Sequence, residues 1–306
     1  MSSGITWVDT HVHVSNIGRG GEDRGDILPS LLDVMKGSGA DLRFAISVDG
    51  PWIRRMMEDP TQILEGNRFI HDLANRAPDR LRGACTINPH FLDASLDAMR
   101  VCFEEWEFPL FGEMLPYIMD YRMNTDSVAT LVRAAAEYGK PVQVHISTSN
   151  SGPQGPFEGG GTEQLEDLMD LAERVPEANT ILAHFVGTEK DDPPVVSGYL
   201  DQIERRYGSF PGNFWAEIRD FNSPGVPVAL ERIPKDRLIV GTDWVTREGP
   251  PFLPYGVVFG TKRAEDNPHS PGVERMVQFL ADSGATEDDI EGIAYRNAAG
   301  LLRIEA

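Results

Sequence analysis

The residues in this sequence best suited to chemistry are two histidines that lie two positions apart near the N-terminus. His11 and His13 end Trp7–Val14, an apolar and β-branched run that is typical of a strand. Alternate residues of a strand face the same side, roughly 6.6 Å apart along the chain, so the two imidazoles can converge on one cation. Taken alone, the pair fits metal ligation about as well as it fits two hydrogen-bonded core histidines.

Later apolar runs end in residues of the same kind. His145 and His184 each lie at the end of such a run, and Asp243 follows another. Four of the seven histidines therefore lie, with one carboxylate, at the ends of predicted strands. Nitrogen and oxygen ligands from separate strands, with an open coordination position, are typical of a catalytic divalent ion, most often zinc. These residues alone do not decide which of His145 and His184 binds the metal.

The elements that must position these residues alternate along the whole chain. Eight short apolar runs are predicted as strands: Trp7–Val14, Leu42–Val48, Leu81–Ile87, Pro109–Met114, Val142–Ile146, Thr180–Phe185, Asn213–Ile218 and Leu238–Val240. Apolar residues recur three or four positions apart in Leu64–Ala77, Leu92–Glu105, Val128–Tyr138, Leu165–Arg174 and Val195–Tyr207, which predicts helices. Eight such units close most naturally into a (β/α)8 TIM barrel, and barrel enzymes place catalysis at the C-terminal strand ends.

We expect one domain over residues 1–306, because no repeat or shift in composition divides the chain. A doubly wound open sheet is the alternative fold, but no glycine-rich phosphate loop follows any predicted strand. Glycine- and proline-rich stretches do follow the strands, and we expect them to be active-site loops: Gly18–Gly25, Ser151–Gly161, Pro193–Pro194 and Gly249–Gly256.

The composition excludes several functional classes. The 306 residues include 48 acidic and 28 basic side chains, for a formal net charge of −20, which opposes binding to nucleic acid or to an anionic membrane surface. No apolar stretch approaches the roughly 18 residues of a membrane helix, and no signal peptide is evident, so we expect a soluble cytoplasmic protein. Cys85 and Cys102 are the only cysteines, which excludes a disulfide scaffold and a thiolate zinc site and predicts two buried thiols.

The combined motifs resemble a known family of metalloenzymes. Asp9-x-His11-x-His13, the histidines at the ends of the fifth and sixth strands, Gly241-Thr242-Asp243-Trp244 and Arg296-Asn297-Ala298-Ala299 resemble the amidohydrolase superfamily over the whole chain. Within it they resemble the amidohydrolase-2 branch, which includes aminocarboxymuconate-semialdehyde decarboxylase-like proteins and several lactonases. The resemblance implies a barrel in which His11, His13, His145 and Asp243 bind metal. It also implies an acid/base or oxyanion-stabilising role for His184, a structural hydrogen-bond role for Asp9, and, since relatives often dimerise, it leaves a homodimer open.

Glu113 ends the predicted fourth strand, and three roles are open to it. It resembles the strand-four glutamate of TatD-like metalloenzymes, which implies that it bridges to a second ion. It could instead orient a ligand histidine, or form a plain ion pair. A carboxylated lysine is excluded as a metal bridge, because none of the five lysines ends a predicted strand. We expect one zinc ion or two, and no ligand role for His71, His90 or His269.

Side chains that follow the strands are candidates to hold a small-molecule substrate. The aromatic ones favour an apolar or aromatic ligand, unless they merely pack the loops: Trp52, Tyr117, Phe157, Phe185, Phe221, Trp244 and Tyr255. Arginines in similar places could clamp a carboxylate: Arg19, Arg54, Arg122, Arg219 and Arg247. Arg219 is the first choice among them because it directly follows the seventh strand. The residues predicted to bind substrate are Arg219, Trp52, Phe157 and Trp244.

The leading functional hypothesis is a metal-dependent hydrolase of a small cyclic ester or amide. Asp243 or His184 would deprotonate the attacking water, and the metal and His184 would hold the oxyanion. The alternative is a non-oxidative decarboxylase of an aromatic or unsaturated carboxylic acid, with His184 as the proton donor. A non-catalytic barrel ranks last, because structural zinc sites are normally closed by four side chains.

Overall fold

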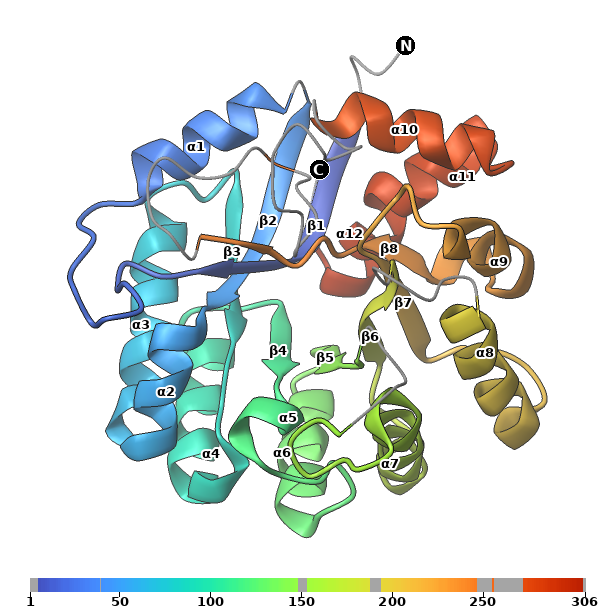
Figure 1. The fold of residues 1–306 in the computed structure, drawn as a ribbon. Coiled ribbons are helices and arrows are strands. Elements are labelled where there is room, and N and C mark those ends of the chain that lie inside the picture. The colour runs from blue at the N-terminus through green and yellow to red at the C-terminus, as the bar shows by residue number, and fades with distance from the viewer. Residues whose placement is uncertain are drawn as a thin grey trace.

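The protein is a closed barrel of eight parallel strands with helices outside it (Figure 1). The structure is a computed structural model, and it describes residues 5–38, 40–147, 153–187, 194–246, 255 and 272–304. Each strand pairs with the next one in the chain, and β1 pairs with both β2 and β8, which closes the sheet. The predicted TIM barrel is therefore confirmed.

All eight predicted strands are present, with ends that agree to within two residues. They are β1 (Thr6–Val14), β2 (Asp41–Val48), β3 (Leu81–Cys85), β4 (Leu110–Met114), β5 (Val142–His145), β6 (Thr180–Val186), β7 (Phe214–Ile218) and β8 (Leu238–Val240). A further short strand, β9 (Trp244–Val245), pairs with β1 beyond β8. It continues the line of β8 after a break at residues 241–243, where Asp243 lies.

The helices that cover the barrel include all five that the sequence predicts. The helices of the described ranges are α1 (Leu28–Gly37), α2 (Gly50–Glu58), α3 (Thr61–Asn75), α4 (Leu92–Arg100), α5 (Pro116–Met119), α6 (Asp126–Glu137), α7 (Gly160–Arg174), α8 (Pro194–Tyr207), α9 (Gly225–Arg232), α10 (Gly272–Asp282), α11 (Glu287–Glu291) and α12 (Asn297–Leu302). The predicted helix Leu92–Glu105 is α4 followed by a π-helical turn, Val101–Glu105. Within the described ranges, none of these helices has the length and hydropathy needed to span a bilayer.

The buried apolar residues form two clusters. The larger apolar cluster fills the layer between the sheet and the surrounding helices. A smaller cluster fills the interior of the barrel and includes Ala298 and Leu302 of α12. The side chain of Asn297 anchors this helix by donating hydrogen bonds to the carbonyls of Lys235 and Leu238, at the start of β8. The late Arg-Asn-Ala-Ala motif therefore closes the N-terminal end of the barrel and leaves the opposite end to the polar residues.

Several expected features can be compared directly with the structure, and others lie outside the described residues. Cys85 and Cys102 are buried free thiols, as predicted. Arg247, His269 and Pro193 lie outside the described residues, as do residues 151–152 and all of the Gly249–Gly256 stretch except Tyr255.

Candidate metal centre

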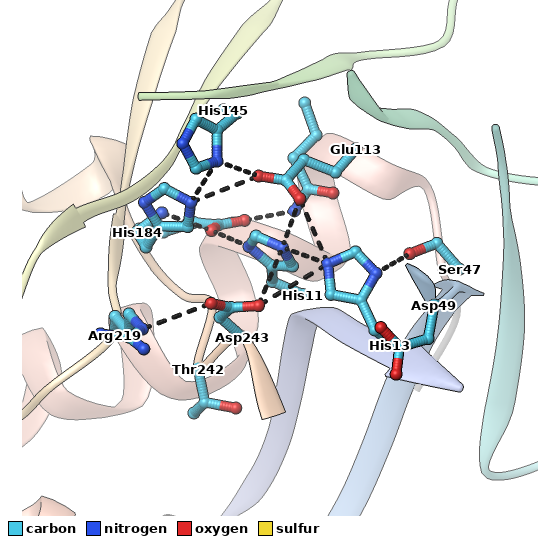
Figure 2. A network of polar contacts seen from close by, with 12 residues as sticks. His11, His13, Ser47, Asp49, Glu113, His145, His184, Arg219, Thr242 and Asp243 are labelled. Carbon is cyan, nitrogen blue, oxygen red and sulfur yellow. Dashed lines mark hydrogen bonds and ion pairs between the residues drawn. The ribbon is translucent and has the colours of Figure 1, made fainter. Parts of the chain in front are cut away.

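The C-terminal ends of the strands open into a cavity of about 500 Å³. Five of the predicted metal or catalytic residues line it: His13, Glu113, His145, His184 and Asp243. His11 lies directly beneath them and is buried. Figure 2 shows the imidazole rings and the two carboxylates turned toward one another from separate strands. The structure thus brings together all six residues that the sequence selected as ligands or acid/base groups.

The first group of donor atoms is built on β1. The Nε2 atoms of His11 and His13 are 3.0 Å apart, and each is 3.2 Å from Oε2 of Glu113. Oδ1 of Asp243 lies near the two histidines, at 3.8 Å from His11 Nε2 and 3.6 Å from His13 Nε2. Ligands bound at about 2.0–2.2 Å around one tetrahedral ion are roughly 3.3–3.6 Å from one another. The donors of His11, His13 and Glu113 therefore lie close enough together to hold a single cation.

The second group lies on β4, β5 and β6. His145 Nδ1 is 2.9 Å from His184 Nε2, and these atoms are 3.1 and 3.3 Å from Oε1 of Glu113. The two oxygens of Glu113 thus face different groups, which Figure 2 shows plainly. The structure places Nδ1 of His145 beside His184 and Glu113. The metal-ligand role that the resemblance implied for His145 stays a prediction.

Irregular backbone brings the donors together. The pairing of β1 with β2 shifts register between Asp9 and Val12, and the pairing of β4 with β5 shifts around Glu113. His184 and Asp243 have φ angles of 40° and 55°, in the left-handed region that non-glycine residues rarely adopt. Such bulges and rare conformations re-aim side chains next to active sites. The side chains of His184 and Asp243 are therefore aimed by local backbone geometry that a regular strand does not have.

Glu217 is a functional residue that the sequence analysis missed. It is fully buried on β7, and its Oε2 accepts hydrogen bonds from His11 Nδ1 at 2.8 Å and from the backbone N–H of His184 at 2.9 Å. Its Oε1 accepts hydrogen bonds from Thr10 and Gln143. Because a carboxylate only accepts, His11 carries a proton on Nδ1, which leaves Nε2 as the nitrogen that can bind a cation. The available signal was a lone acid within the apolar strand Phe-Trp-Ala-Glu-Ile.

Gly241 makes room for this carboxylate. A Cβ atom at position 241 would lie 2.1 Å from Cδ of Glu217, closer than any van der Waals contact. The glycine of the Gly-Thr-Asp-Trp motif is therefore required by close packing against Glu217.

Two further contacts orient the β1 histidines. The backbone carbonyl of Val48 accepts a hydrogen bond from Nδ1 of His13 at 3.0 Å, which again leaves Nε2 for a cation. Asp9 accepts hydrogen bonds from the backbone N–H groups of His11 and Thr242 and from the hydroxyls of Thr242 and Tyr255. Asp9 thereby ties the end of β1 to the segment that carries Asp243, which is the structural role that the resemblance implied.

The buried charges of the centre shift the pKa values of its residues. Burial lowers the pKa of His11, but the charges of Glu113 and Glu217 outweigh burial and raise this pKa well above its ordinary value. Burial raises the pKa of Glu113, yet the charge of His11 and the hydrogen bonds of His11 and His13 hold it well below its ordinary range. The pKa of Asp243 is lowered mainly by His11, against the effect of burial. The buried carboxylates thus favour a positive charge at His11, and a divalent ion bound there would supply that charge in place of a proton.

Arg219 is the one predicted substrate-binding residue that lines the cavity. Its Nε is 3.5 Å from Oδ2 of Asp243. Arg19, Arg54 and Tyr117 line the same cavity, and the ring of Tyr117 stacks on His145 with centroids 4.1 Å apart.

The other three predicted substrate contacts lie elsewhere in the described structure. Trp52 donates its indole N–H to Asn16 and stacks on Phe69. Phe157 is buried under the guanidinium of Arg122. Trp244 is buried and packs near the ring of Phe44. None of the three is among the described residues that line the cavity, so substrate contact by Trp52, Phe157 and Trp244 stays a prediction.

The remaining histidines of the described ranges lie away from the centre. His71 belongs to α3 and stacks on Trp106, and Nε2 of His90 donates a hydrogen bond to the carbonyl of Met119. Neither belongs to a group of donors that could hold a metal.

Solved structures of several enzymes share this fold. The structure matches 5-carboxyvanillate decarboxylase from Sphingomonas paucimobilis with a TM-score of 0.66 and 15% identity, over 99% of this chain and 100% of that one. It matches dihydroxybenzoic acid decarboxylase from Polaromonas sp., solved with bound manganese and an inhibitor, with a TM-score of 0.64 and 15% identity, over 99% and 98%. A probable 2-pyrone-4,6-dicarboxylic acid hydrolase from Acinetobacter baumannii matches with a TM-score of 0.58 and 13% identity, over 97% and 99%. At these identities the likeness shows the fold alone.

The sequence comparison goes further than the fold. No curated protein matches the chain significantly. The model of one family, described as amidohydrolase (Amidohydro_2), matches residues 8–304 and so spans nearly the whole chain, including every donor of the centre. The histidine and carboxylate groups of this chain indicate a divalent metal, and the solved structures named above include decarboxylases and a hydrolase. This chain therefore belongs to the amidohydrolase family, Amidohydro_2.

Proposed function

We propose that this protein is a divalent-metal-dependent hydrolase of a small cyclic ester or amide, with zinc as its ion. The observation that supports this proposal best is the placement of Asp243. One of its oxygens faces the imidazoles of His11 and His13, the other lies 3.5 Å from Arg219, and the residue lines the cavity. A carboxylate in this position can accept the proton of a water molecule that attacks a substrate in the cavity.

A cation bound by the β1 histidines would polarise a substrate carbonyl and lower the pKa of water. The chain itself provides the remaining functions. Arg219 holds the outer oxygen of Asp243, and the cavity of about 500 Å³ has the size of a small-molecule site. The predicted acid/base role of His184 competes with metal ligation, because its Nε2 lies 2.9 Å from Nδ1 of His145. We therefore assign the proton-accepting step to Asp243.

Decarboxylation of an aromatic or unsaturated acid is the second candidate. The observation that favours it is a set of three arginines in the cavity wall of a strongly acidic protein: Arg19, Arg54 and Arg219. Guanidinium groups bind carboxylates in a bidentate manner, as a decarboxylase requires. A neutral ring would need no such clamp.

One experiment separates the two reactions. The metal-loaded enzyme is given lactones, lactams and aromatic acids in ¹⁸O-labelled water, and the product label and the released carbon dioxide are measured together. We expect one labelled oxygen per turnover and no carbon dioxide. Stoichiometric carbon dioxide with an unlabelled product would replace the hydrolase proposal by the decarboxylase.

A further inference from the structure

We propose that a cavity at the N-terminal end of the barrel binds a phosphate dianion, either free or as the head group of a small phosphomonoester. The cavity measures about 400 Å³, a size typical of small-molecule sites. Arg82, Lys140 and Arg303 line it, together with one acid, Glu107. This end of the barrel lies opposite the metal centre, so the site goes beyond the proposed function and does not rest on it.

The cations of this cavity come from separate segments that the barrel brings together. Arg82 belongs to β3, Lys140 lies just before β5, and Arg303 directly follows α12. A Cβ atom at position 139 would lie 3.3 Å from both Nη atoms of Arg303, so the guanidinium lies against the backbone beside Lys140. Because α12 closes this end of the barrel, its C-terminus carries Arg303 to the starts of β3 and β5.

These cations lack the partners that several arginines have elsewhere in the described structure. Arg206, for example, contacts three carboxylates. Within the described ranges, by contrast, no carboxylate lies within ion-pair distance of Arg82, Lys140 or Arg303. Arg82 donates to the carbonyl of the preceding residue, and Lys140 lies over the ring of Phe103, 5.9 Å from its centroid. In a chain of net charge −20, a cavity that gathers cations without carboxylate partners is unexpected.

The balance of charge in the cavity favours an anion. Burial lowers the pKa of Lys140, the charge of Arg303 lowers it further, and the charge of Glu107 opposes this shift without cancelling it. Lys140 and Arg303 therefore repel each other, and a bound anion would offset that repulsion. The three cations and the one carboxylate give the cavity a formal charge of +2, which a phosphate dianion neutralises.

Phosphate fits this arrangement better than a carboxylate does. Guanidinium groups bind phosphate oxygens through paired N–H donors, and an ammonium group binds them as a point charge. A phosphate group presents at least three acceptor oxygens, so each cation can contact one, whereas a carboxylate presents two. Pro109 and Leu302 also line the cavity, and they provide an apolar wall for the organic part of a phosphomonoester.

The test uses the full-length protein, stripped of metal so that phosphate cannot bind to an ion in the centre. Calorimetric titrations at constant ionic strength use inorganic phosphate, glycerol 3-phosphate and acetate as separate probes. We expect one phosphate bound per chain and no saturable binding of acetate. The tighter of the two phosphate probes decides between free phosphate and a phosphomonoester, and either result supports the site.

Substitutions locate the bound phosphate. Arg303→Ala and, independently, Lys140→Met should each weaken phosphate binding by about 10–100-fold, because hydrogen bonds between charged groups are lost. Glu107→Gln removes a like charge and should strengthen binding by about 2–5-fold. Arg205→Ala alters an exposed arginine of α8 outside the cavity and should bind phosphate as the wild type does. Unchanged circular dichroism and Mn²⁺ binding in each variant check that the fold and the metal centre are intact.

Three results would overturn the proposal. Absence of saturable phosphate binding would exclude the site. Loss of phosphate binding in Arg54→Ala, with normal binding in folded Arg303→Ala and Lys140→Met, would place the anion in the cavity of the metal centre. Acetate binding as tight as phosphate binding would show that the cavity does not select a dianion.

Discussion

The histidines of β1 and those of β5 and β6 face the same glutamate, but the protein supports the two pairs differently. His11 and His13 both donate from Nδ1 to buried acceptors, so each ring is held in one tautomer. His184 has no such partner for its Nδ1 among the described residues. His145 turns Nδ1 toward the centre, and its ring is held by stacking on Tyr117. The comparison teaches that ligand type alone does not set affinity, because the contacts behind each ligand decide how much reorganisation binding requires.

The largest expected effect comes from removing a β1 ligand. His13→Ala should lose the tightly bound cation and lower kcat/KM by about 10³-fold or more, because a bound metal supplies several kcal/mol of transition-state stabilisation. His184→Ala should retain that cation. Elemental analysis and steady-state kinetics of the two variants provide the measurement. If His13→Ala kept its cation while His184→Ala lost it, the β5 and β6 histidines, and not the β1 pair, would hold the tightly bound cation.

Asp9 bonds to the backbone of His11 and of Thr242, and its burial makes the stability of the fold depend on pH. Burial raises its pKa to about 6 from an ordinary value of 3.8. The stability that this raised pKa contributes is fully present below about pH 4 and is lost as the pH rises through about 6, a change of about 3 kcal/mol. Urea unfolding of metal-free protein should therefore show the wild type weakening relative to Asp9→Asn between pH 4 and 7. Parallel pH profiles would show that folding does not raise the pKa of Asp9.

Glu217→Gln should weaken the binding of a cation to the β1 histidines. The amide places an N–H group among donors that now point at a carboxylate, so His11 loses its tautomer constraint. We expect Mn²⁺ affinity at the β1 histidines to fall by about 10–100-fold. Glu231→Gln, which changes an exposed glutamate on α9, is the matched control and should bind normally. An unchanged Mn²⁺ affinity in Glu217→Gln would show that the hydrogen bond from His11 to Glu217 does not strengthen cation binding at the β1 histidines.

The smallest expected effect concerns the stacking of Tyr117 on His145. An aromatic contact of this kind contributes about 0.5–1.5 kcal/mol, so Tyr117→Leu should weaken Mn²⁺ binding that involves His145 by about 2–10-fold. Tyr117→Phe keeps the ring and should bind as the wild type does. Mn²⁺ titration of both variants checks this, and equal weakening in the two would assign the effect to the hydroxyl group.

Much of this protein could be predicted from its sequence, because the relevant signals are local. The eight strands show themselves as short apolar runs, since a barrel strand is buried on both faces. The polar residues that interrupt or end such runs, such as His11, His145 and Asp243, are conspicuous for the same reason. In a barrel, the C-terminal ends of all strands meet at one rim, so these donors were expected to lie near one another.

The grouping of the donors was decided only by the tertiary structure. Regular strand alternation could not show that His145 joins His184, that Glu113 lies between the two groups, or that Glu217 lies beneath His11. The donors meet because β1, β4 and β6 depart from regular pairing at the residues that carry them, and because Asp243 adopts a left-handed conformation. Such conformations are locally unfavourable, and partners from distant segments stabilise them. Glu217 accepts the backbone N–H of His184, and Asp9 accepts that of Thr242, across 33 and 233 positions of the chain.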